Sequence, residues 1–79
     1  MIKYNEMKGW GKPTYRTPKY GNLLSDSYQG TVDQSGDGTW CGWFDNLSRK
    51  HMSEFRFGFK SRSAAARWVN NKLRKVGVK

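Results

Sequence analysis

The chain is short of cysteine and of long apolar runs, and each shortage excludes a class of protein. Cys41 is the only cysteine, so an internal disulfide cannot form and a disulfide-stapled secreted scaffold is excluded. No apolar run approaches the roughly 20 residues of a membrane-spanning helix, and the first residues lack the apolar core of a signal peptide. We therefore expect a cytoplasmic protein that has no membrane partner, and that is associated with the nucleoid if it binds DNA.

Acidic residues are also few, at 6 against 15 lysines and arginines, which gives the 79-residue chain a formal net charge of +9. The positive charge is spread along the chain and does not form one detachable tail. Such a balance favours an anionic partner, nucleic acid above all. Two alternatives stay open: a basic surface that only keeps the protein soluble, and an acidic protein partner.

Leucine and isoleucine are scarce, whereas tryptophan, tyrosine and phenylalanine number 4 each. A chain of this length holds one domain, which buries only about 60% of the surface that the unfolded chain exposes. Each aromatic side chain buries roughly 150–250 Å². We expect a small core built largely from aromatic side chains.

Residues 1–26 carry both prolines and interleave basic with aromatic side chains. No helical or strand period there extends beyond a few residues, which predicts an extended basic and aromatic arm that is at best partly ordered. A compatible alternative is a segment that wraps the core and covers it with its aromatic rings. Residues 27–79 form the predicted folded domain.

Residues 28–60 predict three strands. The first, Tyr28 to Asp33, and the second, Thr39 to Asp45, are joined by a glycine-rich turn. The third runs from Glu54 to Lys60 and alternates apolar with polar residues, which predicts one buried and one wet face. The side chains predicted to point inward are Phe55, Phe57 and Phe59, and those predicted to point outward are Arg56 and Lys60, which flank Gly58.

Residues 62–76 predict one helix. Ser61 is a good N-cap, the alanines at 64–66 favour helix, and Gly77 is placed to end it. An apolar stripe at spacings of three and four comprises Ala65, Val69, Leu73 and Val76, with Trp68 beside it. The predicted fold is therefore α+β, a three-stranded antiparallel sheet with one C-terminal helix across its phenylalanine face. The other sheet face is left open.

Three short motifs follow one another along residues 28–76: Tyr28-Gln29-Gly30, Gly38-Thr39-Trp40 and Gly58-Phe59-Lys60-Ser61, the last leading into the alanine-containing helix. In order and spacing they resemble the AP2 domain, most closely the AP2-like amino-terminal domain of phage and transposon integrases. That family has the fold predicted above and binds duplex DNA. Its open sheet face lies in the major groove, which is wide enough for a small sheet.

The resemblance also decides which way the second strand faces, a choice that its apolar periodicity leaves open. It implies that Trp40, Gly42 and Phe44 point inward. The residues that it places outward are Gln29, Thr31, Asp33, Thr39, Trp43, Asp45, Arg56 and Lys60. Asp33 and Asp45 depart from the family pattern, because cations are expected there and an acid repels the DNA backbone.

The candidate DNA contacts therefore combine the open face with the cations around it. They are Gln29, Thr31, Trp43, Arg49, Lys50, Arg56, Lys60 and Arg62, joined by Lys12, Arg16 and Lys19 of the arm. Trp43 is the sharpest hypothesis, as a ring that stacks on a base or packs on sugar. The alternatives are a second small core under the arm for Trp43, and solvated surfaces for the cations.

Residues for catalysis or metal binding are nearly absent. A zinc site needs about four spaced ligands, and the chain has one histidine, His51, and one cysteine. A Cys41–His51 nucleophile pair is disfavoured, because the cysteine lies in a predicted strand and the histidine in a loop. We expect a non-enzymatic protein with no cofactor.

The predicted function is therefore duplex DNA binding by a small basic protein of phage or mobile-element type, acting as a regulator, a recombination accessory or an architectural factor. The alternative is an inhibitor or adaptor that docks its aromatic face on a host or phage protein. Double-stranded RNA binding is a third possibility, but that fold needs an amino-terminal helix, which the proline and glycine residues of 9–22 disfavour.

Overall fold

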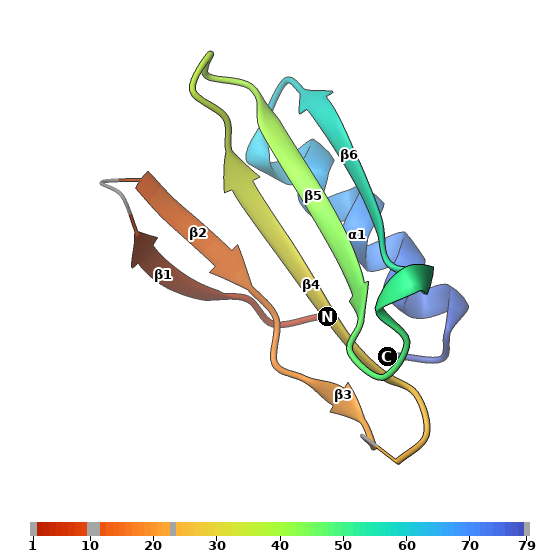
Figure 1. Ribbon diagram of the computed structural model, residues 1–79. Helices are drawn as coiled ribbons and strands as arrows, with labels where there is room; N and C mark the ends of the chain where they lie inside the picture. Colours follow the sequence, from red (N-terminus) through yellow and green to blue (C-terminus); the bar gives the residue numbers. More distant parts are fainter. Residues whose placement is uncertain (1, 10–11, 23, 79) are drawn as a thin grey trace.

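The computed structural model describes residues 2–9, 12–22 and 24–78, which form one antiparallel sheet and one α-helix (Figure 1). The central path of the sheet is β1 (Asn5–Gly9), β2 (Lys12–Arg16), β4 (Ser27–Gln34), β5 (Trp40–Asn46) and β6 (Glu54–Phe59), and the short strand β3 (Tyr20–Gly21) pairs with β4. The helix α1 (Arg62–Lys75) covers one face. The α+β class and the C-terminal helix are confirmed, whereas the three-stranded sheet is wrong, because the sheet has six strands.

The additional strands come from the segment that was predicted to be an extended arm. Strands β1 and β2 form an antiparallel hairpin, and β2 pairs with β4 through Thr14, Tyr15 and Arg16. Pro13 pairs only toward β1, so the amide that it lacks is not needed by β4. The arm prediction failed because long-range pairing with β4 orders a segment that has no apolar period of its own. Trp10, in the same segment, lies outside the described residues.

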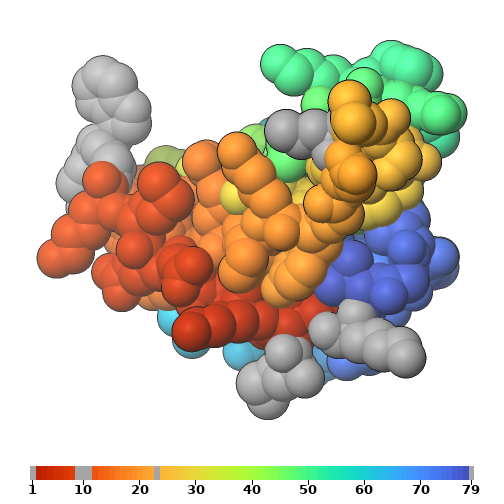
Figure 2. Space-filling model, turned by 90° about the horizontal axis from the view of Figure 1, so that it is seen from below, coloured from red at the N-terminus to blue at the C-terminus, as the bar shows by residue number. Residues whose placement is uncertain are grey.

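The rings of this segment pack on the core, as the wrapping alternative proposed. Tyr4, Tyr15 and Tyr20 lie against a buried cluster that includes Ile2 and Val32. Figure 2 shows the N-terminal residues (red) and the short 3-10 helix η1 (Lys50–Met52, green) on opposite sides of the molecule. The N-terminal segment therefore completes the side of the molecule that α1 occupies.

Two glycines let α1 approach the sheet closely. Ala65, Val69 and Leu73 of α1 are fully buried, and they lie over β4 and β5. A Cβ atom on Gly30 would overlap the Val69 side chain, and one on Gly42 would lie 2.9 Å from Val69 Cγ2. Phe44 is buried on the same side, and Trp40 packs against this core. The inward placement of Trp40, Gly42 and Phe44 is confirmed.

The expected alternation of β6 is wrong, because the strand contains a bulge. Trp40 of β5 pairs with Phe59 and Gly42 pairs with Arg56, so β6 holds one more residue than β5 between these pairs. Gly58 lies there with φ of +88°, a conformation that glycine adopts without strain. The bulge reverses the facing of the residues beyond it, so Phe59 lies against Trp68 of α1 while Phe55 and Phe57 lie on the opposite face.

The ends of α1 follow the sequence signals. Ser61 accepts a hydrogen bond from the Ala64 amide at 3.2 Å, as an N-cap does. At the other end Gly77 has φ of +92° and its amide donates to the Arg74 carbonyl at 3.0 Å. Within the described part of the chain, α1 is too short and too polar to cross a membrane, and no other helix qualifies either.

Candidate nucleic-acid interface

In Figure 1, α1 lies behind the sheet, and we define the sheet face opposite α1 as the open face. Because Gly30 and Val32 face α1, the alternate residues of β4 point away from it. Cross-strand partners share a face, so the registers extend this set to every long strand. The open face comprises Asn5, Met7, Lys12, Thr14, Arg16, Ser27, Gln29, Thr31, Asp33, Cys41, Trp43, Asp45, Phe55 and Phe57.

One row of the open face runs across all five long strands. It consists of the successive cross-strand partners Asn5, Arg16, Thr31, Trp43 and Phe55. Neighbouring strands lie about 4.8 Å apart, so this row is about 19 Å across. A cation on β2 and two aromatic rings on β5 and β6 therefore share one line across the sheet.

Three aromatic rings form a cluster at the β5–β6 side of this face. The Trp43 and Phe57 rings meet edge to face with centroids 5.5 Å apart, and the Phe55 and Phe57 centroids are 5.3 Å apart. Phe55 and Phe57 are 62% and 55% exposed. A contiguous apolar patch of this kind marks an interaction site, whereas single exposed rings do not. We refer to Trp43, Phe55 and Phe57 as the aromatic cluster.

A shallow hollow of about 260 Å³ lies beside Trp43, between β2 and β5. It is lined by Thr14, Arg16, Thr31, Asp33, Trp43 and Asp45. The Asp33 carboxylate accepts hydrogen bonds from the Thr14 hydroxyl at 3.2 Å and from the Gln34 amide at 2.9 Å. The hollow therefore combines one cation, Arg16, and two carboxylates, those of Asp33 and Asp45, with the Trp43 ring on one side.

Formal charge divides unequally between the two sides of the sheet. The open face carries two cations, Lys12 and Arg16, and two acids, Asp33 and Asp45, so its formal charge is zero. The sequence of α1, RSAAARWVNNKLRK, contains five cations and no acid. One of the five, Lys72, is paired with Glu54 at 3.1 Å. Most of the positive charge of the chain therefore lies off the open face.

Five of the predicted contact residues lie on the open face: Lys12, Arg16, Gln29, Thr31 and Trp43. Thr31 is buried between its neighbours, and Gln29 Nε2 donates to the Thr17 carbonyl at 3.0 Å. Arg16 and Trp43 line the hollow. These two long side chains are the best placed of the five to contact a partner.

Two predicted contact residues lie on the α1 side. The Arg56 guanidinium is 5.9 Å from the centroid of the Phe59 ring, because Arg56 pairs with Gly42 ahead of the bulge. The Arg62 guanidinium stacks 4.4 Å from the centroid of Tyr15. The prediction that Arg56 points outward with Lys60 on the open face is therefore wrong. Lys60 itself is exposed in the turn between β6 and α1.

Lys12 lies at the start of β2, and the remaining predicted cations lie in loops. Arg49 forms an ion pair with Asp26 at 3.2 Å, and Lys50 is exposed at the start of η1. Lys12 Nζ donates to the Ser35 carbonyl at 3.3 Å, and Lys19 is exposed between β2 and β3. These side chains border the sheet at separate places and do not form one cluster.

Phe55 and Phe57 were missed as surface residues, because period-2 alternation assigned all three phenylalanines of β6 to the core. The available signal was Gly58, since a glycine inside a strand pattern often marks a bulge. A bulge at that point separates Phe59 from the other two rings. The side that each ring faces also depends on β5 and α1, which the β6 sequence alone does not reveal.

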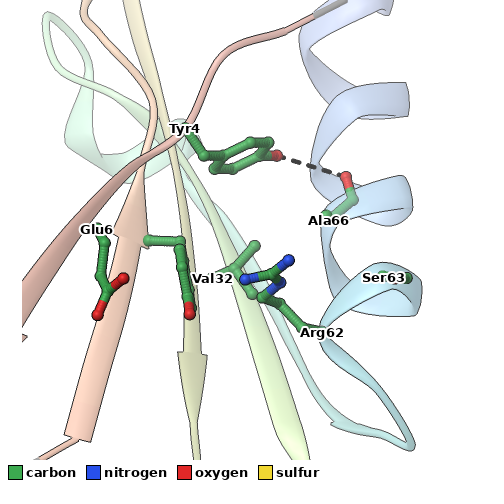
Figure 3. Close-up of a pocket in the computed structure, with 7 residues that line it drawn as sticks. Tyr4, Glu6, Val32, Arg62, Ser63 and Ala66 are labelled. Atoms are coloured by element: carbon green, nitrogen blue, oxygen red, sulfur yellow. Dashed lines mark hydrogen bonds between the residues drawn. The ribbon is translucent and has the colours of Figure 1, made fainter.

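A second pocket, of about 400 Å³, lies between the β1–β2 hairpin and the start of α1 (Figure 3). Glu6, Tyr15 and Arg62 line it, and Tyr4 crosses to the helix. The Tyr4 hydroxyl donates to Asn70 Oδ1 at 2.8 Å and lies 3.4 Å from the Ala66 carbonyl oxygen. Burial raises the pKa of Tyr4 far above its ordinary value. Tyr4 therefore fastens the N-terminal segment to α1 as a neutral phenol.

The cysteine and the histidine lie in different environments. Cys41 is buried in β5, its thiol donates to the Asp33 carbonyl at 3.3 Å, and burial raises its pKa. His51 is exposed in η1. Over residues 2–9, 12–22 and 24–78, no three His, Cys, Asp or Glu side chains come together as metal ligands would.

No protein-family model, curated protein or solved structure matches the chain. The resemblance of residues 28–76 to the AP2 domain therefore stays a prediction.

Proposed function

We propose that this protein binds duplex DNA through its open face, as a regulator, a recombination accessory or an architectural factor of a phage or mobile element. One observation carries the proposal: an uncovered sheet face presents the aromatic cluster beside Arg16, in a chain with a formal net charge of +9. The resemblance to the AP2 domain supports the same partner. Its binding residues would include Trp43, Phe55 and Phe57 on the face and the cations around it.

Part of the open face is narrow enough to enter the major groove of DNA. The major groove of B-DNA is about 12 Å wide, whereas the five long strands measure about 19 Å across. Three strands, about 10 Å across, fit the groove. The strands β4, β5 and β6 would enter it with the aromatic cluster, and β2 would place Arg16 over the phosphates at its rim.

The contacts available on the open face suit sugars and base edges more than phosphates. Aromatic rings pack on deoxyribose and on thymine methyl groups, and a carboxylate such as that of Asp45 accepts from a cytosine amino group. Phosphate contacts would come from the surrounding cations, which position a protein on DNA without reading its sequence. The two acids cost affinity, because each repels the backbone.

The test is duplex binding by the full chain and by the variant Phe55→Ala/Phe57→Ala. We expect the logarithm of affinity to fall linearly with the logarithm of salt concentration, and the variant to bind at least about tenfold more weakly with its fold intact. Val76→Ala, which trims an exposed apolar side chain next to α1, is the matched control and retains full affinity. Failure of the full chain to bind any duplex at about 50 mM salt would contradict the proposal.

A protein partner is the second candidate, favoured by the aromatic cluster beside Asp33 and Asp45. Exposed aromatic residues are frequent anchors of protein interfaces, and the open face carries as many acids as cations, with a formal charge of zero. The variant Asp45→Asn separates the two candidates. On a duplex of A·T pairs, which has no cytosine amino group, it removes a repulsive charge and raises affinity if DNA is the partner, whereas it weakens a complex in which Asp45 contacts a cation of another protein.

Double-stranded RNA binding is less well supported by the fold. That reading needs a helix before the sheet, and the described residues ahead of β4 form the strands β1, β2 and β3. Competition between duplex DNA and duplex RNA of equal length tests it directly. Preference for RNA would replace the DNA proposal.

A further inference from the structure

A second cationic surface lies on α1, on the side of the sheet opposite the open face. Arg67 and Arg74 are exposed on α1, and Ser63, Asn70 and Asn71 lie beside them. Among the residues that the structure describes, neither guanidinium has an ion-pair or hydrogen-bond partner. Their full donor capacity is therefore directed to solvent.

These side chains border a hollow of about 470 Å³ between α1 and the N-terminal segment. Ile2 and Tyr4 form its other wall, and Figure 2 shows that segment (red) on the same side of the molecule as α1 (blue). The described residues that line the hollow include no acid. Its chemistry is that of guanidinium, amide and hydroxyl donors around a shallow groove, which fits anionic oxygen atoms.

The spacing of the two arginines suits a nucleic-acid backbone. Seven residues separate Arg67 from Arg74, which corresponds to about 10.5 Å along a helix. Phosphates follow one another about every 3.4 Å along the axis of each DNA strand, so the pair would span about three of them. A guanidinium binds phosphate through two parallel hydrogen bonds.

The nearest acids do not neutralise this surface. Glu6 lies in the neighbouring pocket that Arg62 and Tyr15 line, and Glu54 is paired with Lys72 on the other flank of α1. Ser63, Arg67, Asn70 and Arg74 follow one another at spacings of three and four residues, so they share one helix face. We define Ser63, Arg67, Asn70, Asn71 and Arg74 as the helix surface.

We propose that the helix surface binds the phosphate backbone of a second duplex, so that one molecule bridges two DNA segments. This inference rests on the proposed function, in which the open face binds the first duplex. The sheet lies between the two surfaces, so one straight duplex cannot contact both. Each surface thus has its own partner: the open face a groove, and the helix surface a backbone.

The experiment uses the full chain and two duplexes, one labelled with a donor fluorophore and the other with an acceptor. At about 50 mM salt, where phosphate contacts are strong, the wild-type protein is expected to bring the two duplexes together and produce energy transfer. The variant Arg67→Ala/Arg74→Ala is expected to lose that transfer while its affinity for a single duplex stays within about threefold. The control Lys8→Ala/Lys72→Ala removes the same charge away from the helix surface, since Lys72 is paired with Glu54 on the other flank of α1, and is expected to retain the transfer.

Other results would overturn the inference. Transfer that persists in Arg67→Ala/Arg74→Ala would show bridging by another route, such as self-association. Tight single-duplex binding by the wild type without transfer would overturn the bridging inference and leave the proposed function standing. Single-duplex binding that is lost in Arg67→Ala/Arg74→Ala but kept in Phe55→Ala/Phe57→Ala would make the helix surface the only site and contradict both proposals.

Discussion

Gly42 and Trp43 are neighbours in β5, yet they face opposite sides of the sheet, and the two sides are built differently. On the covered side, Gly42 and Gly30 leave space that Val69 of α1 fills. On the open side, the large rings of Trp43, Phe55 and Phe57 contact one another, and the two phenylalanines are exposed. Small residues therefore lie where the helix needs close approach, and large ones lie where no described element covers them.

The difference separates the residues that stabilise the fold from those available to a partner. A buried side chain contributes through the apolar area that it removes from water, whereas an exposed ring contributes little until something covers it. The aromatic cluster is thus a surface whose burial is incomplete in the free protein. A partner that covers the aromatic cluster would bury the apolar surface that folding leaves exposed, and that burial would favour binding.

The largest expected effect contrasts Leu73 with Phe57. Leu73 is fully buried, so Leu73→Ala should lower the free energy of unfolding by about 2–5 kcal/mol. Phe57→Ala should lower it by less than about 1 kcal/mol, because the ring is 55% exposed. Urea denaturation followed by circular dichroism measures both. Equal losses for the two variants would mean that Phe57 belongs to the core and that β6 has no bulge.

A smaller effect is expected from adding one methyl group on the covered side. A Cβ on Gly30 would overlap Val69 and lie 3.3 Å from both Leu73 Cδ1 and Thr17 Cγ2. Gly30→Ala should therefore lower the free energy of unfolding by about 1–3 kcal/mol, as overpacking does. Gly36→Ala in the β4–β5 turn is the control, because nothing lies within 4 Å of the added atom. If the two variants have the same stability, α1 does not lie as close to β4 as described.

Tyr4 should make the stability of the covered side dependent on pH. Near pH 7, Tyr4→Phe should lower the free energy of unfolding by about 1 kcal/mol, because the hydrogen bond to Asn70 is lost. Burial raises the pKa of Tyr4 in the folded state, so deprotonation favours the unfolded chain once the pH passes the ordinary tyrosine value of about 10. The difference in free energy of unfolding between the wild type and Tyr4→Phe should therefore disappear as the pH rises from about 9 to about 11. An advantage that stays constant over that range would contradict the burial of the phenol.

The smallest effect concerns the rate at which Cys41 reacts. Its thiol is buried and its pKa is raised, so little thiolate forms near pH 8 in the folded protein. Iodoacetamide should modify Cys41 much more slowly in the native protein than in urea, as followed by mass spectrometry. Equal rates would show that the β5 backbone beside Trp43 opens readily.

Local signals predicted the C-terminal half of the fold well. Ser61, Gly77 and the stripe through Val69 and Leu73 define α1, because a helix is fixed by contacts within a few residues. The strands β1 and β2 were missed, since their order depends on pairing with β4. The outward face of Trp43 was predicted from the resemblance, whereas the exposure of Phe55 and Phe57 depends on the extra residue near Gly58. The strands that form the candidate site were therefore predicted from the sequence. The exposure of its Phe55 and Phe57 side chains was not.

The indole N–H signals of the tryptophans test the central claim most directly, because Trp43 lies on the open face while Trp40 and Trp68 lie on the α1 side. Single Trp→Phe variants assign the signals in a ¹⁵N spectrum, and duplex DNA is then added up to one equivalent. Binding through the open face should shift or broaden the Trp43 indole signal while the signals of Trp40 and Trp68 stay in place. Movement of Trp40 or Trp68 with an unchanged Trp43 would contradict DNA binding through the open face.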